Sequence, residues 1–258
     1  MKFDDLDKAM RVYETSCDRC VIPGMYIVTR IDGRSFTRLT KETCRFGAPF
    51  DVKMRDLMAE TVRHLMNCGF TVIYGYTESD EISLLHSINE TAFSRKHRKF
   101  NSILAGEASA IFTHLLGKPA AFDCRVCELP SRSAVTDYFR WRMEDAHRNA
   151  LNAHCYWKLR FDGKSQGEAT AMLSGMGLAG KNELLFSYGT NFNDLPLWQK
   201  RGIGFYYKMV EKEGVDPRNN AKVAVMRRGL VTEYELPMND AYAALLNGIM
   251  DADENRNA

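Results

Sequence analysis

The chain has 258 residues, of which 45% are hydrophobic and 26% are charged, as is ordinary for a folded globular protein. This length allows one large domain or two small ones with a substantial core. The formal net charge of +2 does not mark the whole chain as a nucleic-acid-binding protein. No apolar run approaches the roughly 20 residues that cross a membrane, and the acidic N-terminus is unlike a signal peptide, so we expect a cytoplasmic protein.

The first half of the chain predicts alternating strands and helices. Two helical patterns, one capped by Asp51 and one ending before Gly117, separate strand-like segments. The strands are predicted from their β-branched and aromatic residues at four places: 25–32, 70–76, 81–86 and 122–129. A polar turn at 77–80 joins the middle two into a hairpin. The order β-α-β-β-α-β predicts an α+β fold of the ferredoxin-like type.

The second half predicts further helices and one more hairpin. Residues 133–158 have apolar side chains at helical spacing, and Ser165 with Glu168 forms a capping box for a shorter helix. A hairpin is expected at 222–236 around Arg228-Gly229. These elements predict a catalytic region at 1–130, a helical extension with a hairpin at 131–250 packed with it as one domain, and a disordered tail at 251–258.

Three carboxyl groups from distant sequence positions are expected to meet at one edge of the sheet. Asp32 ends the first strand, and Asp80 and Glu81 lie at the hairpin turn. Converging like charges are costly unless a cation neutralises them, and oxygen ligands without histidine favour Mg²⁺. Two such ions would suit nucleotidyl transfer, and Gly33 would let the backbone approach them closely. The alternative is a solvated turn with a strand-end aspartate that caps backbone amides.

Basic and cysteine clusters suggest further sites. The segment Arg95–Lys99 follows the hairpin directly and is expected to reach a triphosphate, although a solvated helix face is the alternative. Two Cys-x-x-Cys pairs, Cys17/Cys20 and Cys124/Cys127, raise the question of zinc. The second pair lies in a predicted strand, where residues three apart face opposite sides. We therefore favour reduced thiols over a zinc site.

Taken together, these residues resemble the tRNA(His) guanylyltransferase family, whose members add nucleotides in the 3′-to-5′ direction. The matching segments occur in family order and span about residues 25–200. They are Arg30–Arg34 (Arg-Ile-Asp-Gly-Arg) with Phe36, Tyr74-Gly75, Glu78–Glu81, Phe93–Phe100, Phe122-Asp123, Arg125, Asp137-Tyr138, Trp141-Arg142, Lys181–Phe186 and Asn191–Pro196.

The resemblance implies a palm domain like that of polymerases and nucleotide cyclases. It implies that Asp32, Asp80 and the backbone carbonyl of Gly33 bind two Mg²⁺ ions, and that Glu81 is a third catalytic carboxylate. The nucleoside triphosphate, GTP or ATP, is expected to contact these residues: Asp32, Gly33, Arg34, Ser35, Phe36, Thr37, Ser79, Asp80, Arg95 and Lys99.

The implied substrate is the 5′ end of tRNA. Eukaryotic members carry His-Ile-Asn-Asn-Leu-Tyr-Asn where this chain has His-Arg-Asn-Ala-Leu-Asn-Ala at 147–153, and Ala48 replaces a lysine before Pro49. These differences favour the bacterial and archaeal branch, in which tRNA 5′-end repair depends on a template. The alternatives are non-templated addition of one G to tRNA(His), a cyclase-like enzyme and a non-catalytic RNA-binding module. The resemblance also implies a homotetramer.

Overall fold

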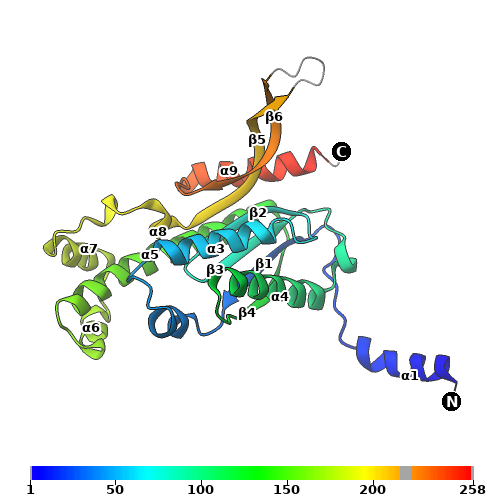
Figure 1. Ribbon diagram of the computed structural model, residues 1–258, viewed down its shortest axis with the longest axis horizontal. Helices are drawn as coiled ribbons and strands as arrows, with labels where there is room; N and C mark the ends of the chain where they lie inside the picture. The colour runs from blue at the N-terminus through cyan, green and yellow to red at the C-terminus, as the bar shows by residue number, and fades with distance from the viewer. Residues whose placement is uncertain (1, 216–221, 257–258) are drawn as a thin grey trace.

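The computed structural model describes residues 2–215 and 222–256, in which an antiparallel sheet separates two layers of helices (Figure 1). The strands are β1 Tyr26–Gly33, β2 Val72–Glu78, β3 Glu81–His86, β4 Phe122–Leu129, β5 Ile203–Val215 and β6 Lys222–Glu233. Their order across the sheet is β4-β1-β3-β2-β5-β6. The first four strands and the helices between them have the predicted β-α-β-β-α-β order, so the predicted fold class is confirmed.

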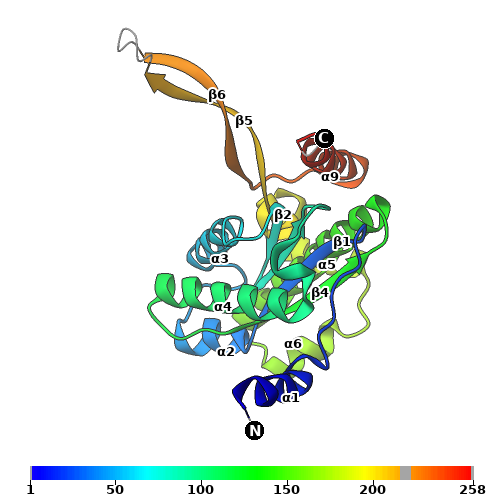
Figure 2. The ribbon, with the colours of Figure 1, turned by 90° about the vertical axis from the view of Figure 1, so that its right-hand side faces the viewer.

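Helices α3 and α4 cover one face of the sheet, and α5 and α9 cover the other (Figure 2). The α-helices of the described residues are α1 Phe3–Thr15, α2 Phe36–Arg38, α3 Val52–Leu65, α4 His97–Leu116, α5 Arg132–Phe161, α6 Gln166–Leu173, α7 Leu178–Ser187, α8 Leu197–Arg201 and α9 Asn239–Glu254. Shorter π or 3-10 segments span Leu39–Thr43, Ala92–Arg95 and Phe192–Asp194.

Alternation along the strands supplies two apolar cores, one on each face of the sheet. Ile27 and Ile31 of β1 pack with α3 and α4, whereas Tyr26 and Val28 pack with α5 and α9. A third cluster holds α6 and α7 against the C-terminal half of α5. Because α5 lies on the sheet at one end and carries α6 and α7 at the other, it connects the sheet to the helical extension (Figure 1).

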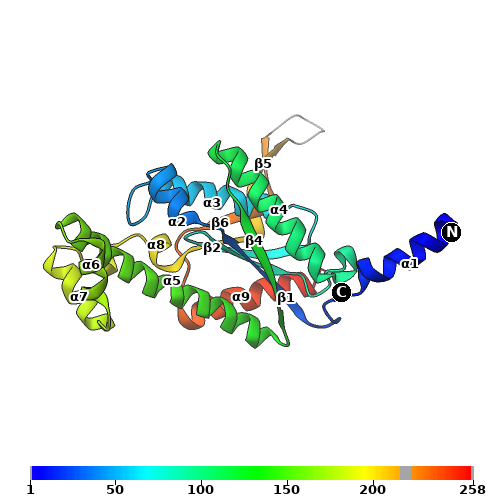
Figure 3. The ribbon, with the colours of Figure 1, turned by 90° about the horizontal axis from the view of Figure 1, so that it is seen from below.

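Local sequence signals determine several element boundaries. The carboxylate of Asp51 accepts hydrogen bonds from the backbone N–H groups of Lys53 and Met54 and so caps α3. Ser165 and Glu168 form the predicted capping box at α6. Helix α1, by contrast, has no buried residue and projects from the layered body (Figure 3). In the described parts of the chain, no helix is long and apolar enough to cross a membrane.

Two predictions for the C-terminal part were wrong. Gly229 lies inside the single strand β6, opposite Lys208 of β5, so the hairpin consists of β5 and β6. A Cβ atom at Gly229 would lie 2.6 Å from Cγ2 of Val210, so this glycine permits close packing across the strands and does not mark a turn. The expected disordered tail is helical as far as Glu254. The Ser87 hydroxyl donates a 2.6 Å hydrogen bond to Asp253 there, while residues 257–258 lie outside the described part.

Candidate active site

The ends of β1 and β3 bring Asp32 and Asp80 together. These strands are antiparallel neighbours in which Asp32 lies opposite Glu81. The backbone N–H of Gly33 donates a 3.1 Å hydrogen bond to the carbonyl oxygen of Asp80. The two predicted metal ligands therefore lie on adjacent segments at the same end of the sheet.

The electrostatics at this end of the sheet favour a bound cation. Burial raises the pKa of Asp80, and the negative charge of Asp32 raises it further. The hydroxyl of Ser79, which donates a 3.0 Å hydrogen bond to Oδ1 of Asp80, acts in the opposite direction. A cation between the two carboxylates would offset both the burial and the repulsion.

Glu81 is held in a buried ion pair with Arg142 of α5. Nε and Nη2 of Arg142 donate hydrogen bonds of 2.6 Å and 2.9 Å to the two carboxylate oxygens of Glu81. Nε of Arg30 lies 3.7 Å from Oε2 of the same carboxylate. Burial raises the pKa of Glu81, and Arg142 counteracts this shift. The charge of the Glu81 carboxylate is thus balanced by Arg142. The catalytic role of Glu81 stays a prediction.

A further carboxyl group, Glu78, lies opposite Glu81 across the hairpin and was not predicted as a site residue. Nη2 of Arg142 is 3.5 Å from Oε1 of Glu78. Burial, and then the charge of Glu81, raise the pKa of Glu78 to about 8, so this group is mostly protonated at neutral pH. The sequence did contain a signal for Glu78. The two residues that flank a two-residue hairpin turn face the same side of the sheet, so Glu78 could have been placed beside Glu81.

The loop after β1 is shaped by the contact between Gly33 and Phe36. A Cβ atom at Gly33 would lie 2.4 Å from the Phe36 ring, so only glycine fits. That ring is buried against Phe112 and Phe122, so it anchors the loop and leaves only the Phe36 backbone for a nucleotide. Ser35 has φ of +61°. The first N–H groups of the helical segment that follows have no acceptor within the helix. They can therefore donate hydrogen bonds to an anion such as a phosphate.

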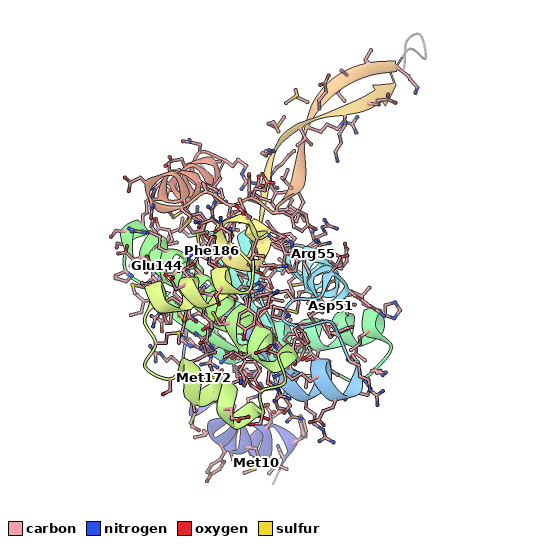
Figure 4. All side chains as sticks on the ribbon, turned by 90° about the vertical axis from the view of Figure 1, so that its left-hand side faces the viewer. Met10, Asp51, Arg55, Glu144, Met172 and Phe186 are labelled. Atoms are coloured by element: carbon pink, nitrogen blue, oxygen red, sulfur yellow. The ribbon has the colours of Figure 1, made fainter. Side chains whose placement is uncertain are left out.

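Beside Asp80 lies a cavity of about 390 Å³, large enough for part of a nucleotide. Of the predicted nucleotide contacts, Phe36, Thr37, Ser79 and Asp80 line it, whereas Arg34 and Ser35 line a separate hollow. Aromatic and cationic side chains that the sequence analysis missed also line the cavity: Phe46, Phe50, Trp157, Trp198, Lys41, Arg45 and Arg55. Arg55, which Figure 4 labels together with Asp51, has its guanidinium 5.1 Å from the Trp198 ring centroid. These side chains can stack on a base and attract phosphates.

Comparisons with known proteins identify the family. The family model for tRNA(His) guanylyltransferase matches residues 7–130, and the model for the C-terminal domain of these proteins matches residues 133–235. The chain belongs to the tRNA(His) guanylyltransferase family. Like the other members, it is a nucleotidyltransferase.

Individual relatives agree with this assignment. A probable tRNA(His) guanylyltransferase of Drosophila melanogaster is 33% identical over 203 residues, and the match covers 75% of this chain and 71% of the relative. Two structures of a bacterial tRNA(His) guanylyltransferase-like protein, one with GTP and one with ATP, superpose with TM-scores of 0.71 and 0.73 at 25% identity. Each covers 95% of this chain and 99% of its own, so the family fold extends over nearly the whole molecule.

The donor set of this family member fits a magnesium ion that the substrate helps to hold. Among the described residues, no group of three or more His, Cys, Asp or Glu side chains is placed to bind a metal ion. Asp32 and Asp80 provide two carboxylates, and Gly33 is next to Asp32 on the same strand. Mg²⁺ commonly takes one or two protein carboxylates and completes its coordination with phosphates and water. The site therefore suits a metal–nucleotide complex better than a free ion.

The structure contradicts the expected phosphate contacts of Arg95 and Lys99. All five N–H groups of Arg95 donate to backbone carbonyls, those of Val21, Ile22, Met25, Ile88 and Glu90. Met25 immediately precedes β1, so it lies seven residues, about 23 Å, from Asp32. Because β3 runs away from the hairpin turn, the basic segment that follows it reaches the opposite end of the sheet. There Nζ of Lys99 lies 5.6 Å from the Phe93 ring centroid.

The cysteines behave as the strand pattern predicts. Cys124 packs with the apolar core under α3 and α4, and Cys127 packs with the core on the opposite face. Burial raises the pKa of Cys124 to about 12. This pair cannot present two thiolates to one ion from a regular strand.

Proposed function

We propose that this member of the tRNA(His) guanylyltransferase family adds nucleotides to the 5′ end of tRNA, in the 3′-to-5′ direction and as directed by a template strand. The observation that carries the proposal is that Asp80 lines the cavity with aromatic and cationic walls, while Asp32 ends the neighbouring strand beside it. The bacterial relative was solved with GTP and with ATP, which supports nucleoside triphosphates as substrates.

Each part of the site has a role in this proposal. Asp32, Asp80 and the carbonyl of Gly33 would hold two Mg²⁺ ions, which when bound supply charge neutralisation for the reacting phosphates. The backbone of residues 33–37 would cradle the triphosphate. Lys41 and Arg45, which line the cavity, would contact it from the cavity wall. The aromatic walls orient the base. Catalysis is then mainly positioning and electrostatic stabilisation.

The reaction takes place in two linked steps. A 5′-phosphate oxygen of the tRNA attacks the α-phosphorus of a nucleoside triphosphate, the bond to the β-phosphate breaks and pyrophosphate leaves. The 3′-hydroxyl of the incoming nucleotide then attacks the activated 5′-phosphorus, and the nucleoside monophosphate leaves as the hydroxyl loses its proton. A tRNA that already carries a 5′-triphosphate needs only the second step, with pyrophosphate as leaving group.

The geometry of Asp51 supports template dependence. This carboxylate lines the cavity, but its oxygens accept hydrogen bonds from the backbone N–H groups of Gly47, Lys53 and Met54. It is therefore occupied with the backbone and poorly placed to recognise one base. The neighbouring aromatic faces stack on any base, since every base has a π-face. Base identity would then come from pairing with the opposite strand of the acceptor stem.

The names of the relatives favour a second candidate, the non-templated addition of one G to tRNA(His). The Drosophila melanogaster protein, at 33% identity, carries the name of that activity. In that case the site itself must select guanine. The two functions differ in whether the added base follows the template.

A template-switch experiment separates the two functions. The substrates are tRNAs that lack their first 5′ nucleotide and carry each of the four bases at the opposing acceptor position, with Mg²⁺ and all four triphosphates. Templated addition should change with the opposing base by at least about tenfold, as a pairing difference of ~1.4 kcal/mol in the transition state gives. Addition of G opposite every base, or only to full-length tRNA(His), would contradict the proposal.

We also propose a homo-oligomer, of which the tetramer implied by the family resemblance is one form. Large apolar side chains of α1 are exposed: Phe3, Leu6, Met10, Val12 and Tyr13. An exposed apolar helix face of this kind is typical of an association surface. Light scattering of the purified protein measures the number of subunits, and a monomer would contradict this proposal.

A further inference from the structure

An exposed tryptophan, Trp141, lies on α5 next to the acidic site. Its side chain is 53% exposed, which is unusual for so large an aromatic residue. Two contacts hold the ring in place. The guanidinium of Arg142 lies 4.5 Å from its centroid, and the Tyr138 ring lies 5.8 Å from it at 77°. One face of the indole is thus covered, and the remainder is a rigid apolar surface open to solvent.

The course of α5 places Trp141 at the carboxylate end of the sheet. The helix starts just after β4, at the far end, and runs back along the sheet. At Tyr138 it reaches the middle of β3, where the hydroxyl groups of Tyr138 and Ser83 are 3.2 Å apart. One turn later Arg142 binds Glu81, which lies opposite Asp32. Trp141 is the residue before this arginine on α5, so it lies at the same end of the sheet as Asp32 and Asp80.

A cation lies on the same side of this site. The side chain of Arg125 is 51% exposed, and its Nη2 atom is 4.0 Å from Oδ2 of Asp32. Arg125 lies opposite Arg30 in the pairing of β1 with β4, so both arginines face α5. Metal binding by Asp32 would release the guanidinium of Arg125 for a phosphate oxygen.

We infer that Trp141 is the stacking platform for the terminal base at the 5′ end of the RNA and that Arg125 contacts the phosphate of that nucleotide. The inference rests on the proposed function and adds the residues that hold the RNA end. An exposed rigid aromatic ring beside cations is the arrangement by which proteins hold unpaired or terminal bases. The cavity that takes the incoming nucleotide is lined by Trp157 and Trp198 and not by Trp141, so each substrate has its own aromatic surface.

The test uses a short acceptor-stem RNA with 2-aminopurine as its 5′-terminal base, titrated with Mg²⁺ but without nucleotide. Wild-type protein should quench the 2-aminopurine fluorescence as the base stacks. Trp141→Ala should lose this quenching and bind the RNA about fivefold more weakly or worse, whereas Trp141→Phe should retain most of both. The matched control is Phe161→Ala, an aromatic residue on the same helix that is 68% exposed and about 30 Å away along its axis.

Quenching and affinity that are unchanged in Trp141→Ala would overturn the inference, as would an equal loss in Phe161→Ala. A change in subunit number with intact quenching would also overturn it and assign Trp141 to a protein interface. Fluorescence quenching and RNA affinity are measured without nucleotide, so neither depends on the nucleotide-addition reaction. A wild-type protein that quenches but adds no nucleotide contradicts the proposed function alone, and an active protein whose Trp141→Ala variant quenches normally contradicts the platform alone.

Discussion

Arg142 and Glu81 form a two-pronged ion pair beneath the acidic site, with hydrogen bonds of 2.6 Å and 2.9 Å between side chains that are 6% and 11% exposed. Glu78 and Asp145 lie at 3.5 Å and 3.1 Å from the same guanidinium, which therefore contacts three carboxyl groups at once. A buried cation with this many partners fixes the relative positions of β2, β3 and α5.

Replacing Arg142 with methionine should lower the free energy of unfolding by roughly 3–5 kcal/mol, because it leaves Glu81 without its buried partner. Adding Glu81→Gln to that variant should restore a large part of the loss. Urea denaturation of both variants measures the effect. If the single variant is as stable as wild type, Arg142 is not the compensating cation that the distances indicate.

Asp32→Asn and Asp80→Asn should abolish nucleotide addition and leave the fold intact, because the charge that holds the metal is lost. Since burial raises the pKa of Asp80, its neutral replacement should melt no lower than wild type. Activity assays beside thermal melts test both statements. Asp240→Asn, which removes an exposed carboxylate of α9, serves as the control with unchanged activity. An active, folded Asp80→Asn protein would disprove the metal role.

Cationic residues should divide into two classes when replaced by alanine. Lys41→Ala should raise the apparent KM for nucleotide, since Lys41 lines the cavity, whereas Lys99→Ala should leave nucleotide titration curves unchanged.

Arg95→Ala should act on folding and lower the free energy of unfolding by about 3 kcal/mol, because five backbone carbonyls lose their donors. A folded Arg95→Ala protein with a raised KM would restore the phosphate contact expected from the sequence.

His86 should make the protein less stable in mild acid. Burial, and then the charge of Arg95, lower the pKa of His86 to about 3, while the unfolded chain takes up its proton near pH 6.5. The unfolded state therefore binds more protons than the folded state between these values. Stability should fall as the pH drops from 6.5 toward 3, by up to about 1.4 kcal/mol per pH unit from this group.

The control for this effect is His86→Gln, which keeps a hydrogen-bonding partner for the hydroxyl of Thr29, 3.0 Å from the imidazole in the structure. Unfolding free energies at pH 7.5, 6 and 5 should decrease less steeply in the variant. An identical slope would show that other groups cause the acid sensitivity.

Much of the fold and the centre of the site followed from local sequence patterns. Alternation of apolar residues marks which side of a strand is buried, and caps such as Asp51 and Ser165 mark where helices begin. These signals gave the β-α-β-β-α-β order, and this order by itself places the end of the first strand beside the hairpin turn. Asp32 and Asp80 could therefore be paired without coordinates, because their positions depend only on strand order and direction.

The tertiary structure decided which charged groups serve the site. Arg95 follows the hairpin closely in sequence, yet β3 carries it to the opposite end of the sheet, where its donors satisfy buried carbonyls. Arg142 and Trp141 come from a helix whose axis and rotation on the sheet no local pattern specifies. The cavity likewise combines segments near residues 41–58 with Trp157 and Trp198. Periodicity reports which face of an element is buried, whereas the partner of a buried charge depends on how separate elements pack.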